Sequence, residues 1–412
     1  MISRRSILGS ATALALTPAF AKAVPADGVT IIAAQAKPIG AQERAARLAK
    51  VQRLMQQAGI GALIVEPGSS LVYFTGVEWW RSERLTAALI PAEGEVTIVT
   101  PFFEAPSIRE SLGIPASIRT WNEHKNPLAL VADWLRERKL MNKPVAIEET
   151  VRLFIVDGLQ KALPGVQTFN GAGIVRGCRM HKSMAEIALM KAAADITTSA
   201  FRAVGRQIQA GMTPADINAL ILAETAKHGG KGGEALVLIG EATAYPHGSH
   251  KPQIVSEGAS ILLDGGCSVH GYVSDISRSF VFGEPSKRQR DVWAQVRQGQ
   301  QIAFEAAQLG RPCGSVDDAV RSWYEKIGYG PGYTLPGLSH RTGHGIGMDG
   351  HEPVNLVHGE ATPLAPGMCF SNEPGLYIPG NFGIRLEDCF YMTEHGPEWF
   401  SVPPPSIDKP FS

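Results

Sequence analysis

The sequence predicts an α+β protein in which a smaller α/β domain precedes a larger domain built from two similar helix–strand halves. Two observations predict this architecture. Helical and strand-like segments alternate over residues 41–170, and from about residue 171 one order of elements occurs twice: a long helix, a shorter helix and then strands. The length of 412 residues leaves room for two or three domains, each with its own core.

Residues 1–23 are predicted to form a twin-arginine-type signal peptide. Arg4 and Arg5 precede a modestly apolar run from Ile7 to Leu16, and Ala21-Lys22-Ala23 offers small residues around a cleavage point. This pattern is typical of a twin-arginine signal, with a Sec signal or a basic N-terminal tail as alternatives. We therefore expect a periplasmic or secreted protein. No run approaches the ~20 apolar residues of a transmembrane helix, so no membrane partner is expected.

The composition is that of an ordinary globular protein, with 44% hydrophobic and 19% charged residues. Lys and Arg number 39, as do Asp and Glu, so the charge balance does not point to a nucleic-acid partner. The five cysteines are odd in number and lack a Cys-x-x-Cys pair. We expect buried free thiols, although an exported protein can form disulfides. The cysteines are Cys178, Cys267, Cys313, Cys369 and Cys389.

A linker over residues 24–40 is expected before the smaller domain, residues 41–170. The smaller domain begins with a helix whose apolar residues recur at helical spacing. Helices are predicted over 41–58 and 128–140, and strands over 62–65, 72–74, 86–91, 96–100 and 144–147. Trp79, Trp80 and Arg81 form an aromatic and basic tip, which either packs locally or shapes a pocket.

The larger domain, residues 171–402, contains the two repeated halves, and residues 403–412 form a tail. Each half begins with a long helix and a shorter one, and each helix start carries a Ser or Thr that can cap it. The predicted caps are Ser183, Thr213, Ser286 and Ser315. Two such halves packed together would leave a cleft between their sheets.

Two aspartates lie on a predicted β-hairpin in the first half. His270-Gly271 fits a two-residue turn, which would place Asp264 opposite Ser277 and Asp275 opposite Gly266. The two aspartates then share one face of the hairpin as diagonal neighbours, within reach of a shared ion. Asp264 follows an apolar run that reads as buried, and a buried unpaired carboxylate is costly. A bound cation would remove that cost.

Two glutamates lie on a second predicted strand pair. A turn centred on Gly380 would put Glu373 opposite Glu387. Like charges directly opposite each other are destabilising, so this geometry calls for a metal ion or a proton between them.

The stretch HRTGHGIGMDGHE, from His340 to Glu352, places three histidines among four glycines. So many glycines argue against a helix and suit a backbone that passes close to a bound group. Histidine is the commonest metal ligand. Together with the four acids, the stretch predicts a centre for two divalent cations, because four carboxylates balance their charge. Oxygen ligands with imidazole suit Mn²⁺, Co²⁺, Fe²⁺ or Zn²⁺.

The stretches DGGCSVHGYVSDISRSF, HRTGHGIGMDGHE, NEPGLYIPGNFGIRLED and PHGSHKP together resemble the pita-bread metallopeptidases. The closer match is the Xaa-Pro branch, which contains prolidase and aminopeptidase P. The resemblance covers nearly all of residues 41–400, including a creatinase-type N-terminal domain. It implies a pita-bread fold with two pseudo-symmetric halves, two divalent metal ions with Mn²⁺ as the first expectation, and a homodimer.

The resemblance also implies roles for individual residues. The metal ligands would be Asp264, Asp275, His344, Glu373 and Glu387, with Asp275 and Glu387 bridging the two ions. His247, His340 and His351 would bind the substrate and stabilise the transition state. Arg385 would contact the metal ligands without binding the metal ions itself. His250 is a weaker rival to His247. Glu373 would carry the proton in catalysis.

The implied reaction is hydrolysis of the bond between the first residue of a peptide and a following proline, by a metal-bridging hydroxide. Prolidase acts on dipeptides and aminopeptidase P on longer peptides, and the sequence leaves the choice open. A non-peptidase hydrolase on the same fold, such as a creatinase-like or phosphotriester-cleaving enzyme, is the alternative class. A member of that class would be expected to have lost ligands, and all five are present here.

Overall fold

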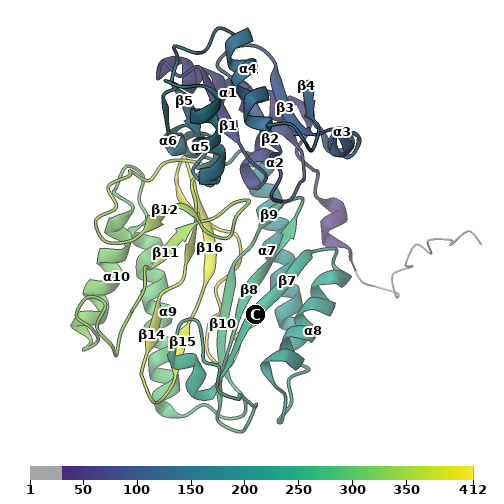
Figure 1. Cartoon of the computed structure of the whole chain (residues 1–412). Helices are drawn as coiled ribbons and strands as arrows, with labels where there is room; N and C mark the ends of the chain where they lie inside the picture. The colour runs from purple at the N-terminus through teal and green to yellow at the C-terminus, as the bar shows by residue number, and fades with distance from the viewer. Residues whose placement is uncertain (1–29, 412) are drawn as a thin grey trace, which may run out of the picture. The chain divides into compact units, whose positions relative to one another are not determined.

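The computed structural model describes residues 30–411 (Figure 1). The predicted signal peptide lies outside the described residues and stays a prediction. Within the described range, no helix combines the length and the apolar composition that crossing a membrane would require.

The smaller domain is a six-stranded mixed sheet with helices on both faces. The strand order is β4-β3-β2-β1-β5-β6, with parallel and antiparallel neighbours. One core contains apolar residues of α1, α2 and α6, and a second core contains those of α4 and α5. Helix α6 follows the predicted boundary at residue 170, but we group it with the smaller domain because it packs in that core. The elements are α1 (Ala41–Gln57), β1 (Ala62–Val65), α2 (Ser69–Thr75), β2 (Ala87–Pro91), β3 (Val96–Pro101), α3 (Ala105–Ser111), β4 (Ala116–Trp121), α4 (Pro127–Glu137), β5 (Val145–Ile147), α5 (Leu153–Ala162), β6 (Thr168–Asn170) and α6 (Ala172–Arg179).

The strand predicted over residues 72–74 is wrong, because this segment belongs to helix α2. Nearly all of its side chains are buried, so its sequence has neither the alternation of a half-buried strand nor the stripe of a surface helix. The Thr75 hydroxyl donates to the Leu71 carbonyl at 2.7 Å, one helical turn back. Gly76 then ends the helix in the left-handed conformation, with φ of 80°.

The larger domain repeats long helix, short helix and strands, as the sequence predicts. Figure 1 shows α7 and α8 beside the strands of the first half, and α9 and α10 beside those of the second. The first half contains α7 (Met184–Gly205), α8 (Pro214–Lys227), β7 (Lys231–Ile239), β8 (Ser260–Val269), β9 (Tyr272–Val273) and β10 (Ile276–Val281). The second contains α9 (Lys287–Ala306), α10 (Gly314–Lys326), β11 (Gly343–Gly345), β12 (Glu352–Leu356), β13 (Cys369–Asn372), β14 (Gly375–Tyr377), β15 (Gly383–Arg385), β16 (Asp388–Thr393) and β17 (Gly396–Trp399).

Segments at both ends of the described chain pack against the larger domain. Residues 32–35, within the predicted linker, form a 3-10 helix, and the Ala33 amide donates to the His228 carbonyl at 3.1 Å. Near the C-terminus, Phe411 contacts Phe280 edge-on, with ring centroids 5.1 Å apart.

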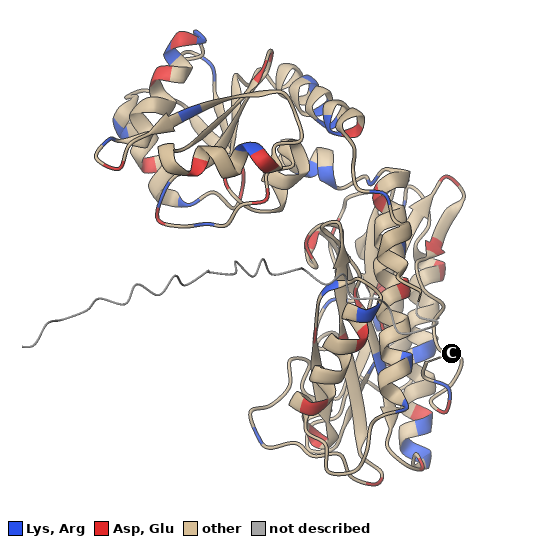
Figure 2. Cartoon of the chain, turned by 90° about the vertical axis from the view of Figure 1, so that its right-hand side faces the viewer, with Lys and Arg blue, Asp and Glu red and all other residues tan. Residues whose placement is uncertain are grey.

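The five cysteines are free and buried, as predicted. Figure 2 shows acidic and basic residues mixed along the ribbon.

Three of the four predicted helix caps are confirmed, and the fourth is wrong. Ser183, Thr213 and Ser286 each cap a helix in a capping box. Helix α10 instead begins at Gly314, and the Ser315 hydroxyl donates back to the Pro312 carbonyl. The carboxylate of Asp317 turns inward, where it is fully buried.

Asp317 connects helix α10 to the segment that carries His340. It accepts hydrogen bonds from Arg321 at 2.7 Å and from the amide and hydroxyl of Thr342 at 3.0 and 2.6 Å. Arg321 in turn donates to the His340 carbonyl at 2.6 Å. A contact network in the fold therefore replaces the cap that the local sequence predicts.

Replacing Asp317 by alanine is expected to lower the free energy of unfolding by about 3–5 kcal/mol, because Arg321 would remain buried without its partner. Denaturant unfolding followed by circular dichroism would measure this loss. Asp318→Ala is the matched control, since the neighbouring carboxylate is half-exposed and pairs with the exposed His358. Equal stabilities of the two variants would contradict the structural role of Asp317.

Candidate metal centre

The first pair of acids lies on the hairpin of β8, β9 and β10, in the predicted register. His270 and Gly271 both have positive φ, 48° and 84°, and form the two-residue turn. Asp264 pairs with Ser277 as expected. Asp275 lies in the short gap between β9 and β10, opposite Gly266. A Cβ on Gly266 would lie 1.7 Å from the Ser274 carbonyl oxygen, so only glycine allows this approach.

The second pair of acids faces across a similar gap. The pair Asn372–Asp388 lies on one side of the gap and the pair Gly375–Arg385 on the other. Glu373 and Glu387 therefore stand opposite each other between these pairs, as the sequence predicts. The Ser277 hydroxyl joins the two halves, because it contacts Asp264 at 2.6 Å and Glu387 at 2.9 Å.

His344 reaches the same point from β11. Its Nδ1 donates to the Gly345 carbonyl at 3.1 Å, which leaves Nε2 as the atom that faces the acids. Nε2 lies 3.3 Å from Glu373 Oε1 and 3.8 Å from Asp275 Oδ2. A Cβ on Gly343 would lie 2.1 Å from the Ser371 carbonyl oxygen. The absence of a side chain at Gly343 thus allows the backbone of Ser371 to pack directly beside the residue that precedes His344.

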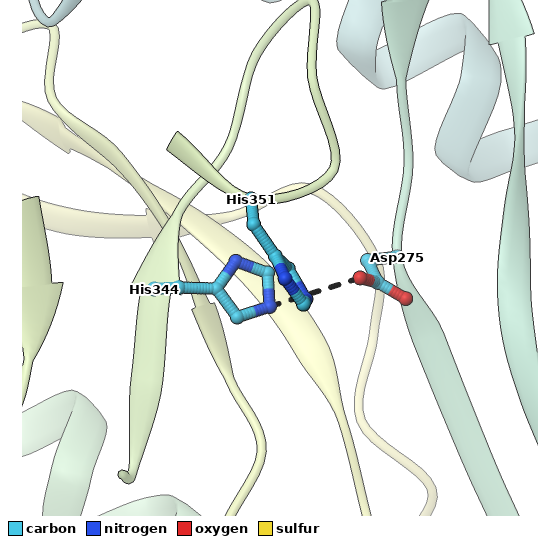
Figure 3. Close-up of side chains that lie close together, drawn as sticks. All are labelled: Asp275, His344 and His351. Atoms are coloured by element: carbon cyan, nitrogen blue, oxygen red, sulfur yellow. Dashed lines mark ion pairs between the residues drawn. The ribbon is translucent and has the colours of Figure 1, made fainter. Parts of the chain in front are cut away.

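These side chains offer three overlapping groups of possible metal ligands. Within each group the ligand atoms lie within 4.8 Å of one another. The groups are Asp264–Asp275–Glu387, His344–Glu373–Glu387 and Asp275–His344–His351. Figure 3 shows the last of them, with both imidazoles turned toward the Asp275 carboxylate. His351, predicted to contact substrate, is thus also close enough to act as a ligand.

The predicted site residues line one pocket of about 560 Å³. Its wall includes the five predicted ligands Asp264, Asp275, His344, Glu373 and Glu387, together with His247, His340, His351 and Arg385. His250 is not among the residues that line it. The structure therefore favours His247 over its rival.

The charges in the pocket fit a bound cation. Burial and the neighbouring carboxylates raise the pKa of Asp275 and Glu387 well above the usual range. Burial also raises the pKa of Glu373 to about 7. Glu387 Oε1 is buried, and no hydrogen-bond partner for it is found among residues 30–411. An oxygen-rich donor set with an imidazole and an unused carboxylate oxygen suits divalent ions of the Mn²⁺ to Zn²⁺ series.

Asp264 differs from the other acids because Arg385 lies against it. Burial acts to raise the Asp264 pKa, but Arg385 and the Ser277 hydroxyl outweigh that effect and lower it. Arg385 also donates to the Pro246 carbonyl at 2.9 Å and to the Tyr377 hydroxyl at 3.1 Å. Arg385 therefore holds the proposed ligand Asp264 in place through an ion pair.

Tyr377, which the sequence did not reveal, contacts two residues of the pocket wall, His340 and Arg385. Its hydroxyl lies 2.7 Å from Nε2 of His340, whose Nδ1 donates to the Arg341 carbonyl at 2.7 Å. Burial, with the Arg385 charge adding to it, lowers the pKa of His340 to about 3, so the ring is neutral and accepts the Tyr377 proton. Ser277 was likewise missed as the contact between the two acid pairs.

The aromatic and basic tip of the smaller domain both packs and lines a pocket. Trp79 stacks on Trp80 with ring centroids 4.4 Å apart, and its indole N–H donates to Glu104 at 3.2 Å. These two residues and Arg81 also line a pocket of about 540 Å³. The two alternatives left open by the sequence are therefore compatible.

Comparison with known proteins identifies both parts of the chain. Residues 188–394 match the model for metallopeptidase family M24, and residues 47–181 match the creatinase/prolidase N-terminal domain. An Xaa-Pro dipeptidase of Lactobacillus helveticus is 30% identical over 366 residues, covering 86% of this chain and 96% of that protein.

Two solved structures share the fold. Dipeptidase PepE of Mycobacterium ulcerans has a TM-score of 0.81 at 31% identity, covering 89% of this chain and 98% of its own. An X-Pro aminopeptidase of Thermotoga maritima has a TM-score of 0.77 at 28% identity, covering 87% and 98%. The chain belongs to metallopeptidase family M24 and has the pita-bread fold, preceded by a creatinase/prolidase-type N-terminal domain.

Proposed function

We propose that this protein hydrolyses the Xaa-Pro bond at the N-terminus of short peptides, with Xaa-Pro dipeptides as the preferred substrates. The observation that carries the proposal is that four carboxylates and His344 line one pocket and form overlapping groups of possible metal ligands. The proteins similar to this chain include a dipeptidase, an Xaa-Pro dipeptidase and an X-Pro aminopeptidase. Two of these names support a dipeptide as substrate, and two support proline after the first residue.

Two divalent ions would be held by Asp264, Asp275, His344, Glu373 and Glu387, with Mn²⁺ as the first candidate. When bound, such ions polarise a carbonyl group and lower the pKa of water. Within the chain, Arg385 and Ser277 orient the acids, and the Nδ1 contact of His344 fixes its tautomer.

Glu373 is the residue that we propose moves the proton. It lines the pocket beside His344, so its carboxylate can take a proton from the attacking water and release it to the leaving nitrogen. The nitrogen of an Xaa-Pro bond has no N–H, so it must receive that proton from the site.

His247 and His351 are proposed to bind the substrate. Both line the pocket, and neither ring makes a hydrogen bond within the described part of the chain. Their ring nitrogens are therefore available for a substrate carbonyl or a developing oxyanion.

Hydrolysis of a matched set of peptides tests this proposal. Metal-stripped protein reloaded with Mn²⁺ is expected to cleave an Xaa-Pro dipeptide faster than the corresponding Xaa-Pro-Yaa tripeptide, and an Xaa-Ala dipeptide slowly. Faster cleavage of the tripeptide would move the assignment to aminopeptidase P specificity. No cleavage of either proline peptide would contradict the Xaa-Pro assignment and favour another substrate class, such as a phosphotriester or a creatinase-like substrate.

A further inference from the structure

The loop that carries His351 is organised by a buried carboxylate. Glu352 follows His351 directly, and only 6% of its side chain is exposed. Its Oε1 accepts the amides of Met348 at 2.9 Å and Asp349 at 3.2 Å, so this side chain closes the loop on itself. The backbone geometry before His351 therefore depends on where Glu352 is held.

Two cations from the junction between the domains hold Glu352. Arg179, at the end of α6, reaches Oε1 at 2.6 Å, and Lys182, just before α7, reaches Oε2 at 3.0 Å. Both cations are largely buried, with 13% and 3% of their side chains exposed. Burial acts to raise the pKa of Glu352, but Lys182 and Arg179 outweigh it and lower the pKa to about 2. We call Arg179, Lys182 and Glu352 the clamp.

The clamp also ties the loop to the smaller domain. Arg179 donates to Asp349 at 2.8 Å and to the Ser70 hydroxyl at 2.9 Å, and Ser70 lies on α2. Ser69, its neighbour on α2, hydrogen-bonds Asp349. The loop before His351 is thus held by residues of α2 and α6, both of which belong to the smaller domain.

The loop is built to admit the clamp. A Cβ on Gly347 would lie 2.7 Å from Lys182 Cε and 2.9 Å from both Glu352 oxygens, so a larger residue would displace them. The Gly347 carbonyl accepts the Val273 amide at 2.9 Å, two residues before Asp275. The same loop therefore meets the clamp on one side and the strand leading to a proposed metal ligand on the other.

The His351 ring itself has no anchor of this kind. It packs against His344 with ring centroids 4.1 Å apart, and no hydrogen bond within the described residues holds its nitrogens (Figure 3). Its position over the pocket must then follow from the loop.

We propose that the clamp is a positioning device that sets His351 over the pocket and makes hydrolysis depend on docking of the smaller domain. This inference rests on the proposed function. A displacement of about 1 Å of a group at the reacting centre can cost about 10²-fold in rate. Loss of the clamp should therefore slow the reaction without removing any group that touches the substrate.

A second buried ion pair at the same junction supplies a matched control. Arg47 on α1 lies 3.2 Å from Glu186 on α7. The Tyr272 hydroxyl accepts a hydrogen bond from Arg47 at 2.9 Å and donates one to Glu186 at 2.6 Å. These partners are as deeply buried as the clamp, with 5% and 4% of the side chains exposed. They also join the two domains, but they contact α1, α7 and the hairpin instead of the His351 loop.

The test compares Glu352→Gln with Glu186→Gln, using Xaa-Pro dipeptide hydrolysis, bound metal per chain and thermal unfolding. Both variants are expected to unfold at lower temperature and to keep the wild-type metal content. Of these two variants, only Glu352→Gln should lower kcat, by about 10-fold to 10²-fold. In a His351→Ala background, Glu352→Gln should lower kcat no further, because the group that the clamp positions is gone.

Arg179→Lys keeps the inference testable if Glu352→Gln does not fold. It retains the charge but loses part of the hydrogen bonding, so an intermediate kcat is expected, again only when His351 is present. Equal losses of kcat in Glu352→Gln and Glu186→Gln, or additive losses with His351→Ala, would overturn this inference alone. Failure of the wild type to cleave Xaa-Pro peptides would overturn the proposed function and this inference with it.

Discussion

Replacing Glu373 by glutamine is expected to lower kcat for Xaa-Pro hydrolysis by about 10²–10⁴-fold, the range typical for loss of a general acid–base group. Glutamine keeps the shape and one ligand oxygen but cannot accept and release the proton. We assign the proton transfer to Glu373 because of its position: it lies in the pocket wall, with Oε1 3.3 Å from His344 Nε2. Steady-state kinetics on the metal-loaded variant would measure the loss.

The same variant needs a control for the cost of an amide in a buried carboxylate position. Glu186→Gln supplies it, because Glu186 is also buried but contacts Arg47 and Tyr272 at the domain junction. The control should retain wild-type kcat with reduced thermal stability. If Glu373→Gln retained kcat within a few-fold of wild type while still binding metal, another residue would have to carry the proton.

Replacing Asp275 by asparagine is expected to change stability and activity in opposite directions. In the metal-free protein, burial together with the charges of Asp264 and Glu373 raises the pKa of Asp275, so folding at neutral pH is penalised by this group. Asparagine removes that penalty, so the free energy of unfolding of the metal-free protein should rise. Loss of a residue that only contacts a metal ligand typically costs about 10–100-fold in activity. Because Asp275 is a proposed ligand itself, the rate of hydrolysis should fall by more than this.

Thermal unfolding with and without Mn²⁺ would test both effects at once. Metal should stabilise the wild type markedly and Asp275→Asn little, because only the wild type has the full ligand set. Asp195→Asn is the control, since the Asp195 side chain is partly exposed and pairs with Lys191 on the same helix. A metal-free Asp275→Asn less stable than the metal-free wild type would show that the four acids do not repel one another as proposed.

The sequence predicted the parts of the site that follow from strand geometry. Once His270-Gly271 is recognised as a two-residue turn, the two-residue period of a strand places Asp264 opposite Ser277. The same reasoning on the turn at Gly380 places Glu373 opposite Glu387. These residues lie close in sequence, so local rules were sufficient.

Other features depend on contacts that local rules cannot supply. Helix α2 is short and buried almost all round, so its pattern fits a strand equally well. Asp317 reads as part of a helix cap, but its partner Thr342 lies 25 positions away. The clamp joins Arg179 and Glu352, which are 173 positions apart. Nothing in the spacing of such residues indicates that they meet.

The metal centre is tested most directly by the activity of metal-stripped protein as Mn²⁺ is added back, measured together with the bound metal per chain. We expect no Xaa-Pro hydrolysis in the stripped protein, a rise in activity that follows metal binding, and a plateau at two ions per chain. Full activity in stripped protein, or metal binding that Asp275→Asn leaves unchanged, would contradict a metal centre formed by these five residues.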